Sequence, residues 1–126
     1  MTKTTYSEPY DPIAELVKIN PVPSILIDTK TLSVAIVNQA TLKLLGYSED
    51  EMIGKPITEF VPLDDIAAIH KSADEPPPEG ETQWRCLTKE GKVLFVEIKY
   101  RETIYRGRAA RFAVLIKSSP TAFDPS

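Results

Sequence analysis

Three consecutive prolines, Pro76-Pro77-Pro78, divide this chain into two parts with different patterns. Proline has no backbone N–H and a fixed φ angle, so the segment cannot form a helix interior or a central strand. Short apolar stretches and helix-stopping residues precede it, whereas long alternating runs follow it. The prolines, with Glu79-Gly80 after them, therefore predict an exposed loop between a block of short helices and a set of strands.

Three strands are predicted after this loop, over residues 82–88, 93–103 and 109–117. Gly91 and Gly107 lie in the two intervening turns, where a positive φ angle is expected. The middle strand has one apolar face, made by Leu94, Val96, Ile98 and Tyr100. Because alternate residues of a strand share a face, we assign this face to the core. In the last strand both faces are apolar, so we expect both to be at least partly covered.

A short amphipathic helix is predicted over residues 12–19. Asp11 can cap its first N–H groups and Pro12 is tolerated at its first position. Asn20 precedes Pro21, and a residue before a proline avoids the helical conformation. We therefore expect the helix to end at this position. Its apolar stripe, formed by Ile13, Leu16 and Val17, must be buried on the domain or on a second chain.

Two β runs, residues 24–28 and 34–38, predict an antiparallel hairpin after this helix. A second helix is expected from Asn38 to Gly46, and Ser48 with Glu51 forms a capping box for a further helical turn. Another helix begins at Leu63-Asp64-Asp65, whose two carboxylates suit the positive end of the helix dipole. This order of elements predicts an α+β fold with an antiparallel sheet.

Composition excludes several classes of function. The chain of 126 residues has a formal net charge of -3 and its charges are mixed along the sequence, which argues against nucleic acid as a partner. Cys86 is the only cysteine, so no internal disulfide can form, and a reducing cytoplasm fits. No apolar run approaches the roughly 20 residues that span a bilayer, so we expect no direct membrane insertion.

A series of short motifs then occurs in a fixed order over residues 20–117: Asn20-Pro21-Val22-Pro23, Ile27-Asp28, Val37-Asn38-Gln39-Ala40, Leu45-Gly46-Tyr47-Ser48, Glu51-Met52-Ile53-Gly54-Lys55, Phe60-Val61-Pro62, Lys89-Glu90-Gly91 and Val96-Glu97-Ile98. The set resembles PAS domains of bacterial sensor histidine kinases and related signalling proteins. The resemblance implies a five-stranded antiparallel sheet in the order 2-1-5-4-3, short helices on one face and an N-terminal amphipathic helix. We accordingly divide the chain into a flexible lead (1–10), the N-terminal helix (11–19), the PAS domain (20–118) and a tail or linker (119–126).

The resemblance implies a sensory or regulatory module that binds a small ligand or a partner, alongside other domains of the same signalling protein. A pocket is expected between the helices and the sheet, with these candidate residues: Ile27, Ile36, Leu45, Phe60, Ile66, Ile69, Trp84, Val96, Ile98, Phe112 and Val114. A homodimer is expected through the N-terminal helix, with contacts from Ile13, Leu16 and Val17. Phe95 is a candidate for the surface on which that helix lies.

No cofactor and no metal are predicted, and haem and flavin are the alternatives. A flavin photosensor of the LOV type needs a cysteine at the start of a central helix, where this chain has Thr58-Glu59-Phe60. Haem would require His70, the only histidine, which lies on the helix after Pro62 and otherwise suits a surface position near a helix C-terminus. Cys86 lies in a strand and is expected to be a small buried residue.

Three other functions stay open at this point: a purely structural dimerisation module, a small enzyme on a similar scaffold, and a haem-based gas or redox sensor. We expect no enzymatic activity, because a single histidine cannot supply a catalytic triad and no buried carboxylate is evident. The chain also departs from the family at its end. Ile116-Lys117-Ser118-Ser119-Pro120 stands where many PAS domains have Asp-Ile-Thr, so the connection to an output domain is expected to differ.

Overall fold

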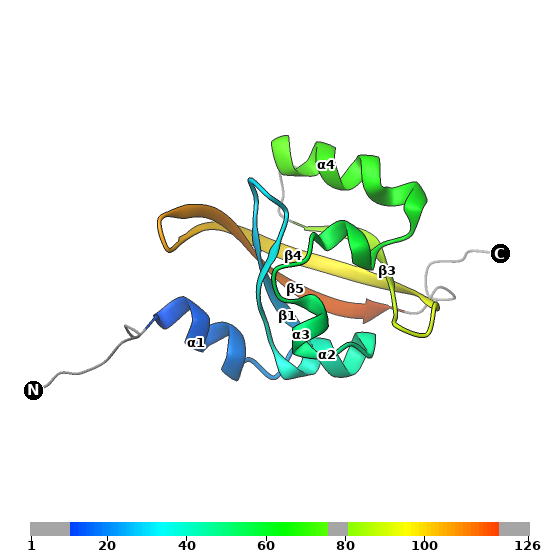
Figure 1. The fold of residues 1–126 in the computed structure, drawn as a ribbon, viewed down its shortest axis with the longest axis horizontal. Helices are drawn as coiled ribbons and strands as arrows, with labels where there is room; N and C mark the ends of the chain where they lie inside the picture. The colour runs from blue at the N-terminus through cyan, green and yellow to red at the C-terminus, as the bar shows by residue number, and fades with distance from the viewer. Residues whose placement is uncertain (1–10, 76–80, 119–126) are drawn as a thin grey trace, which may run out of the picture.

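The structure, a computed structural model, describes residues 11–75 and 81–118. Its fold is a twisted antiparallel sheet with most of the helices gathered over one face (Figure 1). The predicted flexible lead, proline loop and C-terminal tail lie outside the described residues.

Five strands form the sheet: β1 (Ser24–Asp28), β2 (Val34–Val37), β3 (Glu81–Leu87), β4 (Val93–Tyr105) and β5 (Arg108–Ser118). Their order is β2-β1-β5-β4-β3, and every neighbouring pair is antiparallel. The predicted α+β class and strand order are thereby confirmed. The β4–β5 hairpin is the longest element, and it pairs with β1 on one side and with β3 on the other.

The helical elements are α1 (Pro12–Ile19), α2 (Gln39–Leu45), α3 (Glu49–Met52), η1 (Ile57–Phe60), η2 (Leu63–Asp65) and α4 (Ile66–Asp74). The predicted caps are present in the structure. The Asp11 side chain accepts from the N–H groups of α1, and Ser48 and Glu51 form the reciprocal capping box of α3. Gly46 ends α2 with a φ angle of 90°, a conformation that glycine adopts without steric cost.

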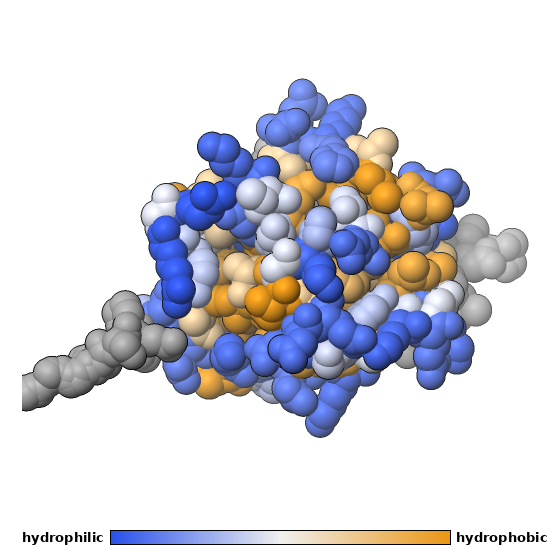
Figure 2. Space-filling model, in the orientation of Figure 1, coloured by the Kyte–Doolittle hydropathy of each residue, from blue (hydrophilic) through white to orange (hydrophobic). Residues whose placement is uncertain are grey.

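Side chains on the two faces of the sheet form separate hydrophobic cores. On the inner face, Ile25, Val96 and Leu115 pack against residues of the helical block such as Met52 and Phe60. Leu94, Ile98 and Tyr100 join this core, as the alternation in β4 predicted. On the side of the helices, Figure 2 shows hydrophobic residues at the centre and hydrophilic residues around the rim.

The outer face is covered by α1, which packs on β1 and β2. Val17 is completely buried there, in contact with a cluster that contains Leu26, Ile36 and Ala110. Phe112 also packs in this cluster, whereas Phe95 does not belong to it. The surface beneath α1 is made by β1, β2, β5 and Tyr105 at the end of β4. Phe95 lies near the opposite end of β4, so its assignment to that surface was wrong.

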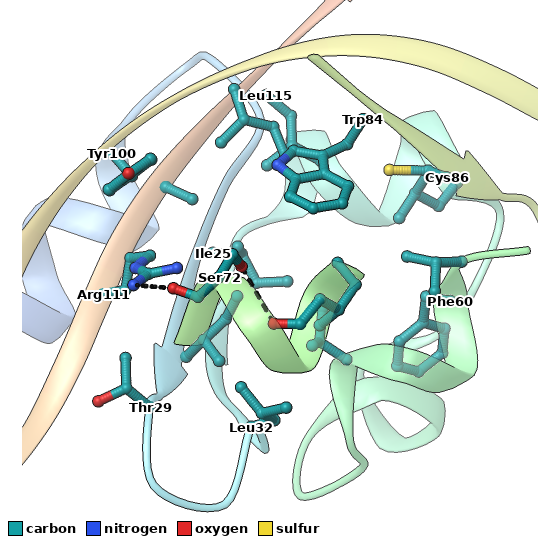
Figure 3. A pocket seen from close by; sticks show the side chains of 17 residues that line it. Ile25, Thr29, Leu32, Phe60, Ser72, Trp84, Cys86, Tyr100, Arg111 and Leu115 are labelled. Carbon is teal, nitrogen blue, oxygen red and sulfur yellow. Dashed lines mark hydrogen bonds between the residues drawn. The ribbon is translucent and has the colours of Figure 1, made fainter. Parts of the chain in front are cut away.

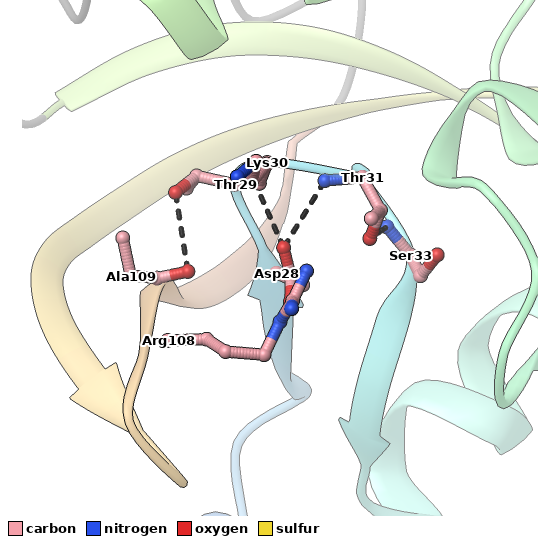
Figure 4. A network of polar contacts seen from close by, with 7 residues as sticks. All are labelled: Asp28, Thr29, Lys30, Thr31, Ser33, Arg108 and Ala109. Carbon is pink, nitrogen blue, oxygen red and sulfur yellow. Dashed lines mark hydrogen bonds and ion pairs between the residues drawn. The ribbon is translucent and has the colours of Figure 1, made fainter.

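A polar network fixes the turn of the β1–β2 hairpin against the β4–β5 hairpin (Figure 4). The Asp28 carboxylate accepts hydrogen bonds from the backbone N–H groups of Lys30 and Thr31 and forms an ion pair with Arg108. The hydrogen bond from Arg108 is the main reason why the pKa of Asp28 falls to about 2. This network holds β1 next to β5 at the end of the sheet where Thr29 faces the interior.

Candidate functional site

A cavity of about 90 Å³ lies between the inner face of the sheet and the helical block (Figure 3). The sheet supplies its floor through alternate residues of β1, β3, β4 and β5. The opposite wall comes from the β1–β2 turn, η1 and α4. Most of the wall is apolar, and it is formed by Ile25, Ile27, Leu32, Leu45, Ile57, Phe60, Val61, Ile69, Trp84, Cys86, Ile98, Ala113 and Leu115.

The beginning of α4 is attached to the sheet by an ion pair. Arg85 on β3 donates two hydrogen bonds to the Asp65 carboxylate, from Nη2 at 2.6 Å and from Nε at 3.0 Å. Two parallel hydrogen bonds of this kind fix both the distance between the two side chains and their relative orientation. Hydrogen bonding to Arg85 lowers the pKa of Asp65, so the carboxylate stays ionised at neutral pH. We expected Asp65 only to complement the helix dipole, and the sequence contained no signal for its partner 20 residues away.

Four polar residues line one end of the cavity, namely Thr29, Ser72, Tyr100 and Arg111, while Phe60 and Cys86 lie at the opposite end (Figure 3). The Arg111 guanidinium is 4.7 Å from the centre of the Tyr100 ring, a cation–π distance. Its Nη2 donates to the Ser72 carbonyl at 3.1 Å, and its Nε donates to Glu102 at 2.6 Å. The cavity therefore has an apolar end and a cationic end.

The thiol of Cys86 contributes only apolar surface to this cavity. Its side chain is buried on β3, and burial raises its pKa to about 12. The thiolate is the reactive form of cysteine, so this thiol is a poor nucleophile at neutral pH. The structure thus confirms that Cys86 is a small buried residue.

Several of the residues predicted for a pocket lie on the wall of this cavity: Ile27, Leu45, Phe60, Ile69, Trp84 and Ile98. They come from β1, α2, η1, α4, β3 and β4, so the fold brings together residues from distant parts of the sequence. Burial also raises the pKa of Tyr100 on the same wall, which keeps its phenol protonated at neutral pH.

The remaining candidates lie elsewhere. Ile36 and Phe112 point to the outer face, where they pack beneath α1, and Val114 shares their side of the sheet. Val96 is fully buried within the inner core, and Ile66 packs beside Leu32, Val61 and Ile69 without reaching the cavity wall.

Both faces of β5 are apolar, so its sequence could not show which set of residues points inward. The inner set is Arg111, Ala113 and Leu115. Arg111 and Ala113 did not resemble a pocket lining, because one is charged and the other is small. The alternation of β4 did place Tyr100, the cation–π partner of Arg111, on the inner face. An aromatic ring on that face was the one sequence signal that could have suggested a cation beside it.

The residues that would hold haem do not fit this cavity. His70 lies on the exposed side of α4, whereas Ile69 and Ser72 are the α4 residues on the wall. Within the described residues there is no cluster of histidine, cysteine, aspartate and glutamate that could hold a metal ion. The region proposed for a flavin-reactive cysteine is η1, which has Thr58, Glu59 and Phe60.

The predicted dimer residues on α1 separate into two groups. Val17 is buried and Ile13 packs beside it, so both contact their own sheet. Leu16 and Ile19, three residues apart on the helix, are 62% and 64% exposed. Leu16 alone among the predicted contacts projects away from the domain.

Taken together, the sheet order, the helices over one face and the cavity between them define a class of small α+β domains. A family model described as "PAS domain" matches residues 22–124. The chain belongs to the PAS domain family, whose members serve as sensory modules in signalling proteins. No curated protein matches the sequence.

Solved structures show the same fold at low sequence identity. The PAS domain of a Desulfitobacterium hafniense protein is 17% identical, with a TM-score of 0.72 and coverage of 79% of this chain and 94% of that one. A PAS domain from a two-component sensor histidine kinase is 14% identical, with a TM-score of 0.70 and coverage of 84% and 93%. The Rhodobacter sphaeroides LOV protein is 14% identical, with a TM-score of 0.71 and coverage of 86% and 66%.

Proposed function

We propose that this PAS domain is the sensory module of a signalling protein such as a histidine kinase, and that it binds a small, mainly apolar molecule in the cavity beneath α4. The observation that carries the proposal is the cavity itself, which is lined mainly by apolar side chains of the inner sheet face and the helical block. Its volume of about 90 Å³ exceeds the 10–15 Å³ or so that one water molecule needs. A domain with a filled core and a purely structural role has no need of such a space.

The signal would arise from a change in the position of α4. The helix contributes Ile69 to the wall and is fastened by few polar contacts, chiefly Asp65 with Arg85 and the Ser72 carbonyl with Arg111. A ligand that fits the cavity better when α4 is displaced shifts the population toward that state. Because Asp65 at the start of α4 is bonded to Arg85 on β3, a displacement of the helix would reach the edge of the sheet.

Trp84 provides a direct test, since it is the only tryptophan and lies on the cavity wall. Titration with 1-propanol should change its fluorescence in a saturable manner. Ala113→Ile is the matched control, because the added methyl groups occupy the cavity next to the sheet. An identical response in the control, or no saturable response in the wild type, would contradict the proposal.

We further propose that the domain forms a homodimer through α1. The exposed pair Leu16 and Ile19 supports this, since two large apolar side chains on one helix face gain free energy when they are covered. Leu16→Glu with Ile19→Glu should convert a dimer into a monomer in light scattering, while Leu63→Glu, at another exposed apolar residue, should not. A monomeric wild type, or a dimer that survives the double substitution, would refute this part.

The proposal assigns no catalytic activity to the domain and places it in the reducing cytoplasm. The free, buried thiol of Cys86 is compatible with that compartment. Among the described residues, no aspartate or glutamate lines the cavity, so acid–base chemistry there would depend on Tyr100. No helix in the described part of the chain is long and apolar enough to cross a membrane.

A further inference from the structure

We infer that the ligand is a small monocarboxylic acid with an apolar body, and that Arg111 binds its carboxylate. The inference rests on the proposed function and names the chemical class of the ligand. It starts from the unequal ends of the cavity: apolar at Phe60 and Cys86, cationic at Arg111 (Figure 3). An amphipathic molecule can lie along it with its tail at the first end and its head at the second.

Arg111 is the only charged residue on the cavity wall among the described residues. Its side chain is only 13% exposed, so the guanidinium is largely shielded from water. An arginine always carries its charge and can donate more hydrogen bonds than the two it makes to Glu102 and Ser72. In a shielded site, a carboxylate is the acceptor that gains most from such a donor.

Glu102 already neutralises Arg111, so the ligand must replace it. The two side chains differ in exposure, with 50% for Glu102 against 13% for Arg111. Half of the Glu102 side chain is already in contact with water, so its carboxylate can rotate toward the solvent when a ligand carboxylate takes its place. The exchange keeps this end of the cavity electrically neutral.

The exchange also connects the head of the ligand with α4. Ser72 lies in the last turn of α4, where backbone carbonyls lack partners within the helix and attract positive charge. Arg111 supplies that partner through its bond of 3.1 Å. A carboxylate that draws the guanidinium toward itself weakens this bond and loosens the end of α4. Arg111 is thus the residue through which occupancy of the cavity would change the helix.

The size of the cavity limits the body of the ligand. A cavity of about 150 Å³ lined by apolar residues accepts benzene, and this one measures about 90 Å³. Short unbranched or slender chains fit this space, whereas long acyl chains require displacement of the helices. Propanoate, which is smaller than benzene, is a suitable probe, and propanamide is its neutral counterpart of nearly the same shape.

Calorimetric titration of the wild type with both probes tests the inference. Propanoate should bind about tenfold more tightly than propanamide. Arg111→Met should abolish this preference while propanamide still binds, and Glu102→Gln, which removes the competing charge, should strengthen propanoate binding severalfold. Comparing the carboxylate with its amide on the wild type tests the ligand class even if Arg111→Met does not fold. If propanamide binds as tightly as propanoate, the ligand class is wrong and the proposed function stands; if neither probe binds, the proposed function fails as well.

Discussion

The guanidinium of Arg111 on β5 and the backbone carbonyl of Ser72 on α4 are joined by a hydrogen bond of 3.1 Å across one end of the cavity. Arg85 on β3 holds the other end of the helix through Asp65. The helix that covers the cavity is therefore fastened at both ends by arginines of the sheet. This arrangement connects the contents of the cavity to the mobility of α4, and it leads to specific predictions.

Arg85→Met should loosen the beginning of α4. The substitution leaves the Asp65 carboxylate, whose side chain is only 18% exposed, without its ionic partner. We expect amide hydrogens of α4 to exchange several times faster, with a small loss in the free energy of unfolding. Hydrogen exchange followed by mass spectrometry measures the first effect. Lys92→Met, which removes an exposed ion pair at 3.8 Å, is the control and should leave α4 unchanged.

Asp28→Asn should weaken the domain most at neutral pH. The pKa of Asp28 is about 2 in the folded protein against an ordinary value of 3.8, so the folded state favours the ionised carboxylate. This stabilisation is complete above pH 3.8 and declines as the pH falls toward about 2. Urea unfolding at neutral pH should show a loss of about 1–2 kcal/mol, because Arg108 is half-exposed and solvent screens the pair.

The difference between the wild type and Asp28→Asn should then shrink as the pH is lowered through this range. Glu90→Gln serves as the control, since Glu90 is 79% exposed and its pair with Lys92 contributes little. An unfolding difference that stays constant from neutral pH to about pH 2 would show that the Asp28 network does not depend on charge.

Val17→Ala should destabilise the domain by about 1–3 kcal/mol, because Val17 is completely buried between α1 and the sheet. Leu16→Ala, one residue earlier on the exposed side, should change the unfolding of the isolated domain by less than about 0.5 kcal/mol. Thermal or urea unfolding at low protein concentration measures the free energy of unfolding of both variants and so distinguishes their effects. Equal effects of the two substitutions would mean that α1 does not pack on the sheet as described.

Much of the fold could be predicted because local rules determine it. Asp11-Pro12 begins α1, Ser48 with Glu51 caps α3, and Gly46 ends α2, each through contacts with residues close in sequence. The alternation in β4 also assigned the inner face correctly, since one of its two faces is clearly more polar.

The site was harder to predict, because its residues depend on pairings between distant strands. Ile36 was placed in the pocket, yet its pairing with Leu26 puts it on the outer face beneath α1. In β5 the sequence allowed either set of residues to face inward. The choice depends on the register with β1, in which Ala113 is opposite Ile25, and no single-sequence pattern specifies that register.

The most direct test of the central claim is an NMR measurement of contacts between bound 1-propanol and the methyl groups of the protein. We expect nuclear Overhauser effects to Ile69, Ile98 and Leu115, which line the cavity, and none to Ile36, which is buried on the other face of the sheet. Contacts with none of the cavity methyl groups, or with the outer face instead, would contradict the assignment of this cavity as the sensory site.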